Sequence, residues 1–147
     1  MRIFPGAICA LALISTSQSA QADIELSLRL SPEIDARSLN VLREGFASAE
    51  FWPSMHAAEG LSLGGHGDEV IAALTPRLAT ETDGQKRCGL ARELVRAGDR
   101  SKVALLLKLL ADSEPYAHVH AAESLFKVNQ IGDGTLLRAA LADRGKA

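Results

Sequence analysis

A repeated four-residue motif constrains the fold of this chain more than any other feature of its sequence. His-Ala-Ala-Glu occurs at His56–Glu59 and again, 64 residues later, at His120–Glu123. A weaker copy between them, Gly89–Leu94, divides the chain into units spaced by 33 and 31 residues. Periods of this length are typical of stacked helix pairs, because one pair cannot bury its apolar face alone and must pack against the next pair.

The alignment of the three copies predicts which residues form the core. It produces one column of alanines and one of leucines, at Ala58, Ala91 and Ala122 and at Leu61, Leu94 and Leu125. Small alanines allow helices to approach closely, and the leucines fill the space between them. Only 4% of the residues are aromatic, which favours such helix packing over a sheet.

Each copy is followed by a Gly-Asp pair and then by a second apolar run, so each unit is expected to be two helices joined by a turn. Glycine suits the left-handed residue that ends a helix, and aspartate suits the N-cap of the next one. The turns are at Gly67-Asp68, Gly98-Asp99 and Gly132-Asp133, and the predicted helices span residues 53–63, 68–78, 85–96, 100–111, 115–128 and 134–143. Thr82 or Asp83, and Ser113, are the expected N-caps between units, and Pro115 fits the first turn of its helix.

Residues 1–22 have the pattern of a secretory signal peptide. One positive charge precedes an apolar run, and a small-residue cleavage motif ends at Ala22. The apolar run is too short for a stable membrane span, although an uncleaved anchor is the alternative. Cleavage leaves Cys88 as the one cysteine, so no internal disulfide framework is expected. Its position beside Ala91 and Leu94 on a helical stripe predicts a buried apolar residue. The predicted location is periplasmic or extracellular.

Residues 23–49 are interpreted as a lead-in and a capping helix before the repeat domain at residues 50–147. Ser31 is a good N-cap, and residues 34–44 suit a helix that ends at Gly45. Residues 23–30 alternate apolar and polar side chains, which favours either a flexible lead-in or an edge strand that pairs with another protein. The helix is expected to cover the first helix pair, and Trp52 is expected to pack against it or to be a contact anchor.

The repeat unit resembles the HEAT repeat family, in particular the short HEAT-like repeats of phycobilisome lyases. The resemblance rests on residues 57–61 and 121–125 with their following Gly-Asp pairs, and it covers roughly residues 51–143. Gly60 departs from the usual alanine, and residues 127–129 lengthen the third unit. The resemblance implies an all-α fold, a short α-α superhelix of about three helix pairs that presents a surface to protein partners, and it implies no reaction.

The repeated histidines and glutamates are the first candidate site. His56 with Glu59, and His120 with Glu123, are three residues apart and therefore share a helix face. Imidazole and carboxylate can bind a metal together, but the two pairs belong to units about 20 Å apart if helix layers are roughly 10 Å thick. We therefore assign no metal to these residues. The alternative is that each histidine and its glutamate form an intrahelical hydrogen bond or ion pair.

Basic residues form the second candidate site. Residues 23–84 carry a net charge of −7, whereas residues 85–108 carry +5, with Arg87, Arg92 and Arg96 among the cations. Such a belt could receive an acidic protein or an anionic glycan, and the alternative is a solvated helix face. The formal net charge of the whole chain is only −2, which argues against a nucleic-acid partner.

The last helix pair is expected to expose an apolar side formed by Leu136, Leu137, Ala140 and Leu141. This side favours self-association through the C-terminal helix pair or a docked partner. No catalytic triad, nucleophile motif or cofactor motif is present. The sequence thus predicts an exported, non-catalytic protein-binding scaffold without a cofactor and, once the signal is cleaved, without a stable membrane span. The alternative is an enzyme or enzyme accessory of the bilin-lyase-like HEAT family.

Overall fold

The fold is described from a computed structural model, which describes residues 31–111 and 116–142. The predicted signal peptide at 1–22, the lead-in at 23–30, and the caps Ser113 and Pro115 lie outside the described residues. Every regular element in the described part is a helix, so the predicted all-α class is confirmed there. No described helix has the length and apolar character needed to span a bilayer.

The contacts within the chain separate two units, at residues 1–38 and 39–147, and the boundary falls inside helix α2 (Pro32–Phe46). In the first unit, the backbone N–H of Ile34 donates to the Ser31 hydroxyl over 3.3 Å, as expected for an N-cap. In the second unit, α2 continues through Gly45 to Phe46, slightly beyond its predicted end. Leu39, Leu42 and Phe46 pack against the first helix pair.

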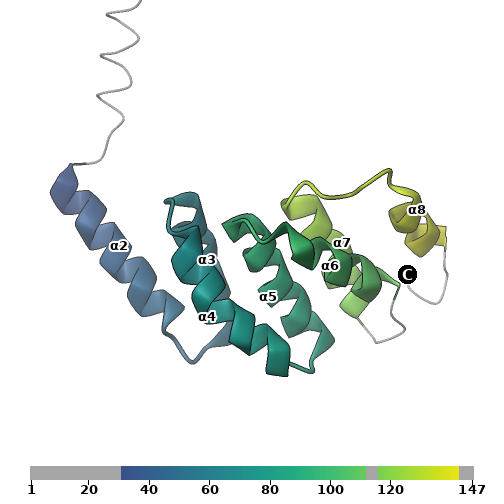
Figure 1. The fold of residues 1–147 in the computed structure, drawn as a ribbon, viewed down its shortest axis with the longest axis horizontal. Helices are drawn as coiled ribbons and strands as arrows, with labels where there is room; N and C mark the ends of the chain where they lie inside the picture. The colour runs from purple at the N-terminus through teal and green to yellow at the C-terminus, as the bar shows by residue number, and fades with distance from the viewer. Residues whose placement is uncertain (1–30, 112–115, 143–147) are drawn as a thin grey trace, which may run out of the picture. The chain divides into compact units, whose positions relative to one another are not determined.

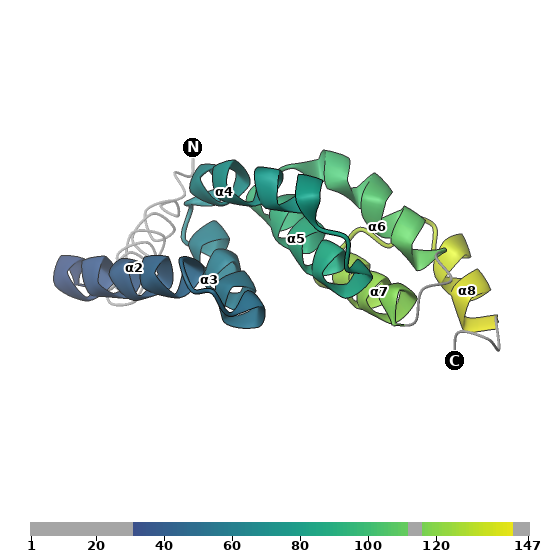
Figure 2. The same ribbon diagram turned by 90° about the horizontal axis from the view of Figure 1, so that it is seen from below.

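The remaining helices follow the predicted order, and the first two predicted pairs pack together. The first is α3 (Phe51–Leu63) with α4 (Gly67–Thr80), and the second is α5 (Gly84–Ala97) with α6 (Val103–Leu110). The third predicted pair is α7 (Ala117–Lys127) and α8 (Thr135–Ala142), but α8 packs mainly against α6. Residues 100–102 form a short 3-10 turn before α6 rather than its first turn. Figures 1 and 2 show α3, α5 and α7 in one layer, with α4 and α6 in a second layer.

Helix α5 is shared by two apolar cores. Leu90 and Leu94 belong to the first core with α3 and α4, whereas Cys88 and Ala91 belong to the second with α6 and α7. The predicted burial of Cys88 is confirmed. Each aligned leucine is fully buried, as are Ala58 and Ala91, while Ala122 is only partly buried. The core therefore runs from one pair to the next through α5.

Three of the predicted turn residues act as expected. Asp83 caps α5, because its carboxylate accepts from the backbone N–H of Lys86 over 2.8 Å. Gly98 ends α5 in the left-handed conformation, with φ of 119°. Asp99 then accepts from the backbone N–H of Ser101.

The first Gly-Asp turn was predicted wrongly. Gly67 is the first residue of α4, whereas α3 ends at Leu63, as predicted, with Gly64 as its C-cap and Gly65 next, with φ of 87°. Gly67 is needed for a different reason, because a Cβ there would lie 2.5 Å from the carbonyl oxygen of Ala97. In the third unit, the left-handed residue directly after α7 is Asn129, and Gly132 follows later with φ of 60°.

Candidate functional site

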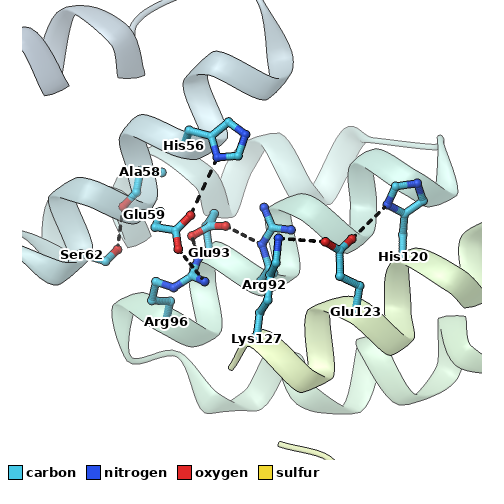
Figure 3. Close-up of polar contacts among 10 residues, drawn as sticks. All are labelled: His56, Ala58, Glu59, Ser62, Arg92, Glu93, Arg96, His120, Glu123 and Lys127. Carbon is cyan, nitrogen blue, oxygen red and sulfur yellow. Dashed lines mark hydrogen bonds and ion pairs between the residues drawn. The ribbon is translucent and has the colours of Figure 1, made fainter. Parts of the chain in front are cut away.

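The repeat register places polar residues at matching positions of α3, α5 and α7. One position is occupied by Glu59, Arg92 and Glu123, and the position four residues later by Leu63, Arg96 and Lys127. The residues of opposite charge face one another across the three helices (Figure 3). We call the row Glu59, Arg96, Glu93, Arg92, Glu123 and Lys127 the charge ladder.

Glu93 is the centre of the charge ladder. Its side chain is fully buried, and its two carboxylate oxygens accept from Nε of Arg92, over 2.6 Å, and from the Arg96 guanidinium. Both arginines are themselves nearly buried, with side-chain exposures of 6% and 12%. A buried carboxylate between two guanidinium groups is satisfied in both charge and hydrogen bonding.

The charge ladder continues from α5 to its neighbours on both sides. Toward α3, Arg96 pairs with Glu59 over 3.0 Å. In α7, Lys127 pairs with Glu123 over 2.8 Å. The hydrogen bond from Lys127, together with the charges of Lys127 and Arg92, lowers the pKa of Glu123 despite an opposing effect of burial. An ion pair therefore joins α5 to α3, whereas α7 interacts with α5 through apolar contact and through the charge of Arg92 near Glu123.

The two repeated histidines lie at the outer ends of this row. His56 is 3.8 Å from Glu59, and His120 is 3.8 Å from Glu123. Figure 3 shows the two imidazoles apart, on α3 and α7. Within the residues that the structure describes, no three histidine, cysteine or acidic side chains are grouped to hold a metal ion.

Trp52 reaches across α5 because the middle unit has glycine where the others have histidine. The aligned residues are His56, Gly89 and His120. A Cβ on Gly89 would lie 3.1 Å from the Phe51 ring and 3.3 Å from the Trp52 ring. Trp52 crosses this gap and stacks on His120, with ring centroids 6.0 Å apart. Its ring thus contacts α5 and α7, which the sequence did not predict.

The structure brings together six of the seven predicted partner-binding residues. His56, Glu59, Arg92, Arg96, His120 and Glu123 all belong to the charge ladder or its ends, whereas Arg87 is half-buried elsewhere on α5. Arg92 and Arg96 do not add to an exposed basic belt, because both are paired with carboxylates. They do not form a solvated face either, since both are nearly buried.

An apolar surface at the far side of the third pair completes the candidate site. Val119 is aligned with Met55 and Cys88, which are fully buried, yet it is 52% exposed. Phe126 is aligned with Val95, which is 7% exposed, yet it is 76% exposed. We call Val119, Ala122 and Phe126 of α7, with Leu137 and Leu141 of α8, the end face.

A cavity of about 440 Å³ opens within the end face, and its lining is mainly apolar. Leu137 and Ala140 pack inward onto the second core, while Leu136 and Leu141 are exposed. The predicted apolar side of the last pair is therefore only partly uncovered. The contribution of α7 was missed, because the alignment of Val119 with the buried Met55 and Cys88 predicts burial rather than exposure.

Comparisons of the chain with protein-family models, with characterised proteins and with solved structures find no match.

Proposed function

We propose that this chain is an exported, non-catalytic protein-binding module, built from HEAT-like helix pairs. The exposure of Val119 and Phe126 carries the proposal, because Met55 and Cys88, aligned with Val119, are fully buried and Val95, aligned with Phe126, is nearly so. An exposed apolar surface of this kind is typical of a docking site. The signal-like residues 1–22 support export.

The charge ladder supports a structural rather than a chemical role for the polar residues. Every buried side-chain nitrogen or oxygen in the described part of the chain has a hydrogen-bond partner. Glu93, Arg92 and Arg96 therefore satisfy one another. Such a framework holds α3, α5 and α7 rigidly, and a rigid surface binds a partner at a lower entropic cost.

The experiment compares capture of proteins from an exported-protein extract by the wild type and by the variant Val119→Asp. We expect a stoichiometric partner for the wild type and its loss in the variant, because a carboxylate in an apolar contact must be desolvated. Val41→Asp is the matched control, since Val41 is also exposed but lies on α2. Equal capture by all three proteins, or none by the wild type, would contradict the proposal.

The cavity in the end face supports one alternative function, that of an enzyme or enzyme accessory of the bilin-lyase kind. Its volume, about 440 Å³, is within the range of small-molecule sites. A chromophore bound to the purified protein would be seen in its visible absorption spectrum and would favour this alternative. Self-association through α7 and α8 is a further way to cover the end face, and light scattering of the purified protein measures it.

A further inference from the structure

We propose that a second surface, separate from the end face, binds an acidic peptide segment of a partner protein. This surface is a cleft of about 310 Å³ where α3, α5 and α7 end. Leu63 is the last residue of α3, Arg96 is close to the end of α5, and Lys127 is the last residue of α7. The three occupy the same position of the repeat, so the cleft follows from the register of the units.

The charge of the cleft favours an anionic ligand. Arg96, Arg100 and Lys127 line it, and no carboxylate does so among the described residues. The carboxylates of the charge ladder hold Arg96 and Lys127 in place. Arg100 is exposed and has no acidic partner within residues 31–111 and 116–142. The charge ladder has three carboxylates and three cations, Arg92, Arg96 and Lys127. Arg100 adds a fourth cation, which leaves one positive charge in excess.

Arg100 is the residue on which the proposal depends most. The carbonyl ends of helices repel anions, and α3, α5 and α7 all end at this cleft. Arg96 and Lys127 are largely neutralised by their partners. The Arg100 guanidinium therefore provides the unneutralised charge, with a planar set of donors that matches a carboxylate.

The rest of the lining favours a peptide over a sulfated or carboxylated glycan. Leu63, Val95 and Val128 give the cleft apolar walls, and Leu63 is 75% exposed. Asn129 and Gln130 also line the cleft, and their backbone N–H groups already donate to Phe126 and Leu125. Apolar walls beside cations and amides suit a segment in which acidic and aliphatic side chains alternate.

The test measures binding of a fluorescein-labelled hexapeptide of alternating glutamate and leucine to the full chain by fluorescence anisotropy. We expect binding that weakens as salt is raised, because exposed charges are screened. Arg100→Glu should weaken binding by about tenfold or more, since attraction is replaced by like-charge repulsion. Lys108→Glu, the same charge change at an exposed residue outside the cleft, should leave binding nearly unchanged.

Three results would overturn the proposal. The first is no binding at about 1 mM peptide, the limit of weak specific affinity. The second is equal loss in Arg100→Glu and Lys108→Glu, or equal binding of the matched glutamine–leucine peptide, since either would indicate general electrostatics or apolar adhesion. The third is tighter, Arg100-dependent binding of dextran sulfate or inorganic phosphate. Val119→Asp should bind the peptide normally, so failure of the end-face proposal is distinguishable from failure of this one.

Discussion

Two glycines, Gly67 and Gly89, show how single residues decide the packing of neighbouring helices. Gly89 leaves room for Phe51 and Trp52 over the middle of α5. Gly67 lets the start of α4 approach the end of α5, at the carbonyl of Ala97. Neither glycine has a left-handed backbone, so the reason for each is the missing side chain.

We predict that Gly67→Ala destabilises the fold. The added Cβ would lie 2.5 Å from the Ala97 carbonyl oxygen, and a backbone atom cannot move aside as a flexible side chain can. Overpacking of this kind costs about 1–3 kcal/mol, which urea unfolding followed by circular dichroism can measure. Thr75→Ala, at an exposed residue of the same helix, is the control, and an equal stability of both variants would contradict the prediction.

These residues also mark a limit of prediction from sequence. The Gly-Asp pattern correctly identified Gly98 as the residue that ends α5, because helix ending is a local property. The same pattern misplaced the role of Gly67, because its constraint comes from Ala97, thirty residues away in the chain. Trp52 was misplaced for the same reason, since its partner His120 is in another unit.

At the level of the helices, the charge ladder joins α5 to α3 by an ion pair, and the charge of Arg92 in α5 lowers the pKa of Glu123 in α7. The pairs within one helix, such as His56 with Glu59, could be predicted from their spacing. The contact between Glu59 and Arg96 could not, because it depends on how far one helix is shifted along another. The burial of Glu93 was unexpected for a similar reason, since it depends on Arg92 and Arg96 enclosing its carboxylate.

We predict that Glu93→Gln destabilises the layer of α3, α5 and α7. The variant keeps the shape of the side chain but leaves the nearly buried Arg92 and Arg96 with less compensating charge. Removing one partner of a buried ion pair typically costs about 3 kcal/mol, measurable as a lower midpoint of urea unfolding.

Glu69→Gln is the control for this variant. Glu69 also pairs with an arginine, Arg43, over 2.9 Å, but both side chains are well exposed. Exposed pairs contribute little because water and salt screen them. A loss of stability as large as that of Glu93→Gln would therefore argue against a special role for burial.

At the scale of the whole molecule, the pKa is lowered for carboxylates on several elements. The hydrogen bond from Arg43 lowers the pKa of Glu69, and that from Ser101 lowers the pKa of Asp99. The backbone N–H of Thr135 lowers the pKa of Asp133, and Lys127 lowers that of Glu123. Each carboxylate thus binds its proton less tightly in the folded chain than in the unfolded one.

We predict that the melting temperature falls as the pH is lowered below about 4 to 5. A lowered folded-state pKa stabilises the fold above the unfolded pKa, and this stabilisation is lost as the pH falls through the folded pKa. Thermal unfolding between pH 7 and pH 3 measures the effect. Glu123→Gln should show a shallower fall than the wild type, and a constant melting temperature over this range would refute the prediction.

The three helix pairs could be predicted for the whole array because each unit repeats the same apolar spacing. The third unit was predicted less well. Val119 and Phe126 are exposed although the apolar residues aligned with them in the earlier units are buried, because their exposure depends on which helices pack beside α7 and not on the residues of α7 alone. The end face is therefore a property of the array rather than of any one repeat.

The sharing of α5 between both cores has a consequence for how this protein tolerates change over evolutionary time. The middle helix packs against two sets of neighbours through different residues, so two of its faces are constrained. The outermost helices pack against only one set of neighbours. Substitutions should accumulate fastest in the outer helices and slowest in α5. New binding properties should therefore arise first in helices that pack against only one set of neighbours.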